Sequence, residues 1–170
     1  MTNILAYKLK SIMLKRKTLF FSYLLLIFLF SSCGAAKKAR IRESKINTVI
    51  QSARSYTGVP YKWGGTTRSG MDCSGLLLNA YKAIHVQIPR TSAEQSEYGK
   101  KIKEKEVQPG DWVFFATGKK KRKITHVGMI TFVKGDNVKF IHASSSLGVV
   151  ESNLKSDYYQ KRLRMVRRPF

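Results

Sequence analysis

One cysteine and two histidines are the residues of this chain best suited to nucleophilic chemistry. Cys73 follows a glycine-rich loop and precedes an apolar run with helical spacing. His126 and His142 come much later in the chain, each beside an apolar, β-like run. A thiol attacks a carbonyl as its thiolate, and a neighbouring imidazole can take up the thiol proton. The order Cys, His, His therefore suits a nucleophile with a base and an orienting partner.

The predicted place of Cys73 in the fold favours an ionised thiol. If Cys73 opens a helix, the free N–H groups and the dipole of the helix N-terminus lower the pKa of the thiol. The same helix end offers the backbone N–H of Cys73 to a developing oxyanion. Asp72 is the expected N-cap of this helix. A further polar side chain must fix the tautomer of the imidazole, and His142 is the candidate.

Each histidine also has an ordinary structural explanation. His126 begins an apolar strand and could be a strand-end polar residue, while alternation makes His142 half-buried, so core packing explains it as well. His85 trails the predicted helix and is interpreted as structural, because a helix C-terminus favours a cation. A zinc site built from Cys73, His126 and His142 is disfavoured by the wide spacing of its ligands. We expect no metal and no other cofactor.

The elements that must position these residues change from helical to strand-like along the chain. Helical spacing predicts helices over 45–56, 73–83 and 91–98, the last with Ser92 and Gln95 in capping-box spacing. Gly135-Asp136-Asn137 has the composition of a hairpin turn between two of the predicted strands. Short β-branched and aromatic runs predict strands over 111–116, 125–133, 138–143, 148–151 and 163–166. Helices followed by antiparallel strands indicate an α+β fold.

Residues 1–32 have the pattern of a lipoprotein signal peptide. Five basic residues precede the apolar stretch 19–30, which is shorter than the roughly 20 residues of a membrane-spanning helix. Small residues before Cys33 resemble a bacterial lipoprotein cleavage site, so we expect acylation of Cys33. A basic tether over 33–44 and a folded domain over 45–170 would follow. An ordinary secretory signal is the alternative, and translation could also begin at Met13.

The expected export and the net charge limit which partners are possible. Acylation of Cys33 would leave Cys73 as a free thiol in an oxidising compartment. Of the 32 Lys and Arg residues, 27 follow Cys33, against 10 acidic residues, so the mature chain would carry a net charge of +17. Anionic lipid or an acidic envelope polymer suits an exported chain of this charge, and we expect no nucleic acid partner. Solvated lysines of a basic proteome are the alternative.

From about Tyr56 onward the chain resembles the NlpC-type cell-wall cysteine peptidases, a branch of the papain-like enzymes. The resemblance rests on motifs in the family's order: Tyr61-Lys62-Trp63-Gly64-Gly65, Asp72-Cys73-Ser74-Gly75-Leu76, Pro89-Arg90-Thr91-Ser92, Pro109-Gly110-Asp111, His126-Val127-Gly128 and His142-Ala143. It implies an α+β, papain-like fold with helices packed on an antiparallel sheet. The departures are Trp112, Thr131, Phe132 and the basic loop 119–123.

The resemblance also implies a role for each matched residue. Cys73 would be the nucleophile, His126 the base and His142 the residue that orients the base. Tyr61 would place its hydroxyl near the oxyanion hole. The substrate groove would be lined by Asp72, Ser74 and Arg90.

The short single domain and the lipoprotein signal resemble most closely the lipoprotein murein endopeptidases of the bacterial envelope. This resemblance implies a membrane-anchored hydrolase that acts on peptidoglycan stem peptides, with lipid on Cys33 and an unknown regulator. The expected bond is the D-alanyl–diaminopimelate cross-link, and the γ-D-glutamyl–diamino acid bond is the alternative. Gly34 after Cys33 favours the outer membrane. A non-catalytic wall-binding lipoprotein and a transacylase are the other hypotheses.

Overall fold

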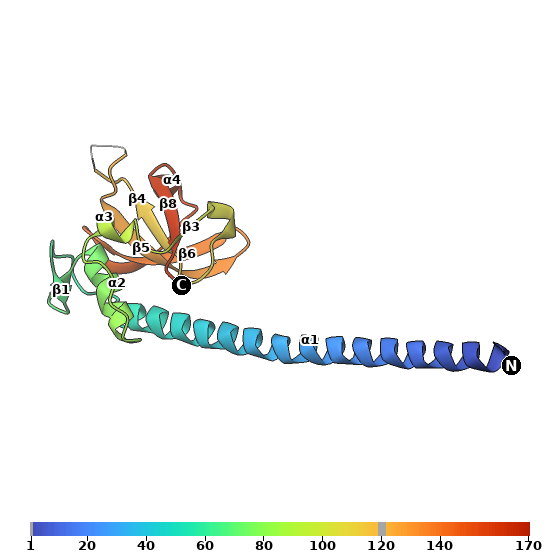
Figure 1. The fold of residues 1–170 in the computed structure, drawn as a ribbon. Helices are drawn as coiled ribbons and strands as arrows, with labels where there is room; N and C mark the ends of the chain where they lie inside the picture. The colour runs from blue at the N-terminus through green and yellow to red at the C-terminus, as the bar shows by residue number, and fades with distance from the viewer. Residues whose placement is uncertain (1, 119–121) are drawn as a thin grey trace. The chain divides into compact units, whose positions relative to one another are not determined.

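The computed structural model describes residues 2–118 and 122–170. The chain divides into two compact units, Met1–Arg42 and Glu43–Phe170. Helix α1, Thr2–Arg54, begins in the first unit and ends in the second (Figure 1). Within the described residues, no helix combines the length and the apolar character that crossing a bilayer requires. The side chain of Cys33 lies outside what the structure describes.

The helix expected over 45–56 is the last part of α1 rather than a separate element. Residues 35–40 are Ala, Lys and Arg, all good helix formers, so the helix runs unbroken through the expected tether. The apolar residues behind the prediction are buried in the second unit: Ile46, Val49, Ile50 and Ala53. The helix ends four residues before Gly58, whose φ of 85° is strained for any residue with a side chain.

A six-stranded antiparallel sheet forms the centre of the second unit, in the order β3-β8-β4-β5-β6-β7. Its strands are β3 (Lys100–Ile102), β4 (Trp112–Phe115), β5 (His126–Lys134), β6 (Asn137–Ser144), β7 (Gly148–Asn153) and β8 (Leu163–Arg168). Five of these strands were predicted to within two residues, and β3 was not predicted. The hairpin turn at Gly135 and Asp136 is confirmed, since Lys134 pairs with Asn137.

Short elements connect the sheet to the rest of the domain. They are the hairpin β1 (Thr66–Thr67) and β2 (Gly70–Met71), the helices α2 (Cys73–Lys82), α3 (Ser92–Gln95) and α4 (Asp157–Gln160), and the 3₁₀ turn Glu104–Glu106. The helix predicted over 91–98 is a single turn, and its capping box pairs Thr91 with Glu94. The predicted pairing of Ser92 with Gln95 is wrong, because Gln95 is buried and its amide donates to the carbonyl of Pro89.

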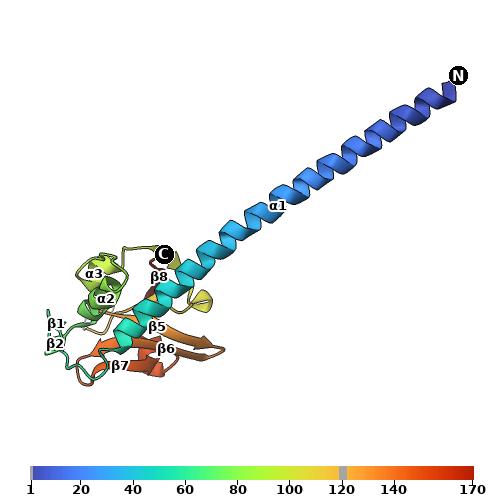
Figure 2. The ribbon, with the colours of Figure 1, turned by 90° about the horizontal axis from the view of Figure 1, so that it is seen from below.

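Different apolar clusters cover the two faces of the sheet. Helix α2 and the last turns of α1 lie on one face (Figure 2). They share a core there with Trp112, Phe114 and Met129. On the other face, Phe115 and Phe140 pack with residues that include Tyr159. Because α2 packs against β5 and β6, its N-terminus lies beside the start of β5. The expected α+β fold is confirmed.

The departures from the family pattern at Trp112, Thr131 and Phe132 have structural explanations that leave the site intact. Trp112 is fully buried, donates to the Tyr81 hydroxyl at 3.0 Å and stacks on Tyr98. Thr131 and Phe132 lie at an irregularity in the β5–β6 register. They are five and six residues from His126, about 16 to 20 Å along the strand.

Candidate active site

The nucleophile candidate is the first residue of α2, as predicted. Asp72 caps the helix: its backbone is extended, with φ −91° and ψ 175°, and its carboxylate accepts from Gly75 N at 2.6 Å. Gly75 permits a very close approach, because a Cβ there would lie 2.4 Å from the Gly65 carbonyl oxygen. The helix N-terminus is thereby held against the glycine-rich loop, with Cys73 at its end.

Asp72, Ser74 and Arg90, which the resemblance implied would line the substrate groove, form one hydrogen-bonded cluster. The Arg90 guanidinium donates to both carboxylate oxygens of Asp72, at 3.0 and 2.8 Å, and to the Ser74 hydroxyl at 2.9 Å. Burial opposes ionisation, but hydrogen bonds from Arg90, Gly75 N and Ser74 hold the pKa of Asp72 below its usual value. All three residues line a pocket together with Cys73. The cluster is therefore a charged wall beside the thiol.

Tyr61 lines the same pocket. It belongs to a loop that backbone hydrogen bonds connect to Met71. The backbone N–H of Lys62 donates to the Met71 carbonyl, and that of Met71 donates to the Pro60 carbonyl, both at 3.1 Å. Burial raises the pKa of Tyr61, and the neighbouring Cys73 and Asp72 raise it further. The phenol keeps its proton and can donate a hydrogen bond toward the thiol.

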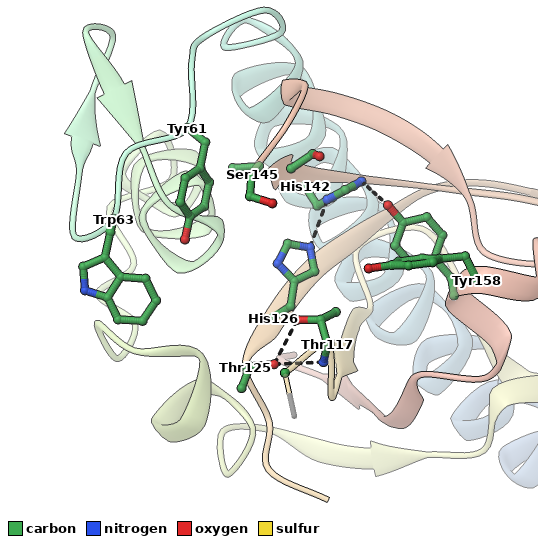
Figure 3. A pocket seen from close by; sticks show the side chains of 12 residues that line it. Tyr61, Trp63, Thr117, Thr125, His126, His142, Ser145 and Tyr158 are labelled. Carbon is green, nitrogen blue, oxygen red and sulfur yellow. Dashed lines mark hydrogen bonds between the residues drawn. The ribbon is translucent and has the colours of Figure 1, made fainter. Parts of the chain in front are cut away.

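The two histidines come from adjacent strands and meet directly. His126 begins β5 and His142 lies on β6, and their Nε2 and Nδ1 atoms are 2.9 Å apart (Figure 3). Their rings are perpendicular. His142 is only 1% exposed, which agrees with the burial predicted from alternation. Because one histidine directly contacts the other, His142 is placed to set the orientation of His126.

Two further residues, Ser152 and Tyr159, contact His142 and were not found from the sequence. The Ser152 hydroxyl is 3.0 Å from His142 Nε2, and the Tyr159 hydroxyl is 3.1 Å from the same nitrogen. The strand predicted over 148–151 stopped one residue short of Ser152. Extending the period-two pattern to Asn153 could have found Ser152, which is directly opposite Phe140. No sequence pattern pointed to Tyr159 on the short helix α4.

The Cys73 thiol lies beside the start of β5, the strand that begins with His126. The backbone N–H of Val127, the residue after His126, donates to the Cys73 sulfur. The pocket lined by Cys73 and the pocket lined by His126 and His142 share three residues: Tyr61, Trp63 and Thr125. Trp63 is 85% exposed at this shared border (Figure 3). The thiol and the imidazole pair thus open onto adjoining parts of one cleft.

Burial keeps the central groups uncharged. It raises the pKa of the Cys73 thiol to about 11, against hydrogen bonds from the backbone N–H groups of Val127, Ser74 and Cys73 itself. It lowers the pKa of His126 to about 4, and burial together with the neighbouring His126 lowers that of His142 to about 3. The expectation of a thiol pKa lowered by the helix N-terminus is therefore wrong for the free structure. The resting site holds a thiol and two neutral imidazoles.

The basic loop before His126 falls partly outside the described residues, which exclude 119–121. Its two ends are joined where the structure describes them. The Thr125 hydroxyl accepts from the backbone N–H of Thr117 at 2.9 Å and lies 3.0 Å from the Thr117 hydroxyl. The loop therefore leaves and re-enters the sheet at the edge of the cleft (Figure 3).

Comparison with known proteins agrees with this geometry. Residues 58–168 match the model of the NlpC/P60 family. The chain belongs to the NlpC/P60 family. The matched segment contains all the motifs on which the resemblance was based, from Tyr61 to His142. The resemblance to this family is therefore confirmed.

Relatives in the NlpC/P60 family include named endopeptidases. The chain is 38% identical over 124 residues to a "Probable endopeptidase" of Haemophilus influenzae, which covers 72% of this chain and 74% of that protein. It is 35% identical over 121 residues to the "Murein DD-endopeptidase MepS/Murein LD-carboxypeptidase" of Escherichia coli, covering 71% and 61%. A solved NlpC/P60 protein from Bacillus cereus superposes with a TM-score of 0.64 at 31% identity, over 72% of this chain and 39% of that one.

Proposed function

We propose that this protein is a cysteine endopeptidase that hydrolyses peptidoglycan, with Cys73 as nucleophile, His126 as base and His142 as orienting residue. Family membership and the names of the relatives support a peptidoglycan hydrolase. The observation that carries the catalytic assignment is the meeting of the α2 N-terminus with the start of β5. There the free thiol of Cys73 lies against the backbone N–H of Val127, the residue after His126, and the His126 ring is hydrogen-bonded to the buried His142 ring.

The chemistry follows an acyl-enzyme route. The Cys73 proton passes to His126 as the sulfur attacks the amide carbonyl, and the oxyanion accepts from the backbone N–H of Cys73 and from the Tyr61 hydroxyl. The C–N bond then breaks, and the leaving amine takes the proton from His126. Water, activated by His126, hydrolyses the thioester and restores the thiol. The charged wall of Asp72, Ser74 and Arg90 would hold the polar groups of the stem peptide.

We propose the D-alanyl–diaminopimelate cross-link as the bond that is cut. The relative named a murein DD-endopeptidase supports this choice. A relative from Bacillus subtilis, named "Bifunctional muramidase/DL-endopeptidase CwlT", is 39% identical over 117 residues, but the match covers only 34% of that protein. Because this relative is named a DL-endopeptidase, the γ-D-glutamyl–diamino acid bond is the second candidate.

Product masses from purified cross-linked muropeptide dimers separate the two bonds. The full chain in detergent should convert dimers to intact monomers if it cuts the cross-link. Cleavage after γ-D-glutamate would instead release truncated stems while the cross-link persists. Cys73→Ala should lower the rate by more than about 1,000-fold while the protein stays folded. Wild-type turnover by Cys73→Ala would refute the nucleophile, and wall binding without any new product would favour a binding lipoprotein. Transfer of the acyl group to an added amine would reveal a transacylase.

We also propose that lipid on Cys33 anchors the enzyme to an envelope membrane, with the outer membrane favoured by Gly34. The apolar stretch 19–30 and the small residues before Cys33 support this proposal. Metabolic labelling with a clickable fatty acid should tag the wild-type chain, and Cys33→Ser should carry no label. An unlabelled wild-type chain that is still exported would favour an ordinary secretory signal.

A further inference from the structure

The far side of His142 carries a pair of hydroxyl groups that the proposed triad does not use. Ser152 Oγ and Tyr159 OH lie 3.0 and 3.1 Å from the same nitrogen, His142 Nε2. Burial raises the pKa of Tyr159, and the nearby Ser152 hydroxyl opposes this rise. They come from β7 and α4, so distant parts of the chain converge on a single atom.

The His142 ring is held in place by packing as well as by these contacts. It stacks on Phe140, with ring centroids 4.8 Å apart and planes 22° apart, and meets Tyr159 edge-on. Its ring is therefore confined, and only the position of its proton is left to be determined. A neutral imidazole carries one N–H and one acceptor nitrogen, and the partner at one nitrogen decides which form is present.

The contacts of both histidines dictate which tautomers can support catalysis. For His126 Nδ1 to accept a proton, the proton of neutral His126 must be on Nε2, where it donates to His142 Nδ1. His142 must then carry its own proton on Nε2. A proton there needs an acceptor, and Ser152 Oγ and Tyr159 OH are the two oxygens within reach.

We propose that Ser152 and Tyr159 are positioning residues that hold His142 in its Nε2–H tautomer and thereby keep His126 Nδ1 free as the base. This inference rests on the proposed roles of His126 and His142. When His126 becomes protonated during attack, its Nε2–H continues to donate to His142 Nδ1, and the hydroxyl pair keeps that acceptor available. Among the hydrogen bonds that the structure describes, both residues contact His142 and not the thiol, so both act through His142.

The direct test is the tautomeric state of His142 in the full chain. Protein labelled with ¹⁵N-histidine in detergent should show His142 protonated at Nε2 in long-range ¹H–¹⁵N spectra. Removal of both hydroxyls in Ser152→Ala/Tyr159→Phe should shift His142 toward the Nδ1–H form. The kcat for muropeptide dimers should fall at least about tenfold, as expected for a base held in the wrong tautomer, with KM within about twofold.

Matched variants separate this role from general packing. Each single variant keeps one acceptor, so its loss of kcat and its shift toward the Nδ1–H form should be smaller than those of the double variant but measurable. Relative to Ser152→Ala/Tyr159→Phe, the variant Ser152→Thr/Tyr159→Phe restores a hydroxyl at position 152. It should recover the Nε2–H form of His142. Tyr158→Phe removes the neighbouring hydroxyl on α4 and should leave the tautomer unchanged. Ser156→Ala removes the hydroxyl of a nearby serine that makes no side-chain capping hydrogen bond, and it is a second control for the tautomer of His142.

The outcomes distinguish this inference from the proposed function. If His142→Ala lowers kcat but the double variant retains both wild-type kcat and the Nε2–H tautomer, Ser152 and Tyr159 are not positioning residues and the triad still stands. If His142→Ala leaves kcat unchanged, the proposed role of His142 fails first. If the double variant does not fold, the tautomer populations of the two single variants decide: unchanged Nε2–H populations in both would overturn the inference.

Discussion

At the scale of the residue, the site combines a proposed nucleophile and a proposed base that are both uncharged at rest. Burial places the pKa of Cys73 at about 11 and that of His126 at about 4, so neither group ionises near pH 7. The thiolate would form only as the proton passes to His126 during attack. Because oxidation follows thiolate character, a protonated thiol also resists oxidants better than a thiolate does.

This resting state predicts the pH dependence of thiol alkylation. The rate constant for iodoacetamide at Cys73 should be low at pH 7 and rise about tenfold per pH unit toward pH 11, because only the thiolate reacts. The rate is measured by mass spectrometry in a Cys33→Ala background, which leaves one cysteine. A rate constant that stays flat between pH 5 and pH 8 would contradict the prediction, since it would indicate a preformed thiolate–imidazolium pair.

At the scale of the element, the N-terminus of α2 depends on a backbone contact that only glycine allows. A Cβ at Gly75 would meet the Gly65 carbonyl oxygen at 2.4 Å and an Asp72 carboxylate oxygen at 3.1 Å. Backbone atoms of the loop cannot move away as a flexible side chain could. Since Cys73 is two residues away, any shift of this helix end moves the proposed nucleophile.

Gly75→Ala should therefore destabilise the folded protein strongly, although it adds only one methyl group. We expect the free energy of unfolding to fall by about 1 to 3 kcal/mol, as for overpacking in a core, together with a loss of kcat. Urea denaturation followed by the fluorescence of buried Trp112 measures the first effect. Gly118→Ala is the control, because its Cβ would meet nothing closer than Thr125 Cγ2 at 3.6 Å. Equal stability of the two variants would show that the helix end can relax.

At the scale of the whole molecule, the pair formed by half-buried His126 and buried His142 links stability to pH. His126 and His142 have folded pKa values of about 4 and about 3, below the ordinary 6.5 that they regain on unfolding. The unfolded chain then binds more protons below pH 6.5. The stability that the neutral pair contributes is complete above pH 6.5 and is lost progressively as the pH falls from 6.5 to about 4 for His126 and to about 3 for His142.

Between pH 7.5 and pH 4.5 we expect each histidine to remove on the order of 2 to 3 kcal/mol from the free energy of unfolding. Urea denaturation at both pH values measures the loss. His142→Gln should make it clearly smaller, whereas His85→Gln should not change it, because His85 is exposed. If His142→Gln has the same pH dependence as the wild type, burial of His142 does not carry this linkage.

Local sequence patterns were sufficient to predict much of this protein. Capping chemistry placed Asp72 and Cys73 at the start of a helix, and the change from helical to alternating spacing indicated helices followed by an antiparallel sheet. These features depend on residues within a few positions of each other, so they can be recognised in the chain itself. The motifs from Tyr61 to His142 indicated the family in the same way.

The tertiary structure alone decided how the site is assembled and charged. The contact between His126 and His142, and those of Ser152 and Tyr159 with His142, join strands and a helix that only the register of the sheet brings together. The thiol pKa was predicted in the wrong direction, because a helix N-terminus is a local feature whereas desolvation depends on everything packed around Cys73.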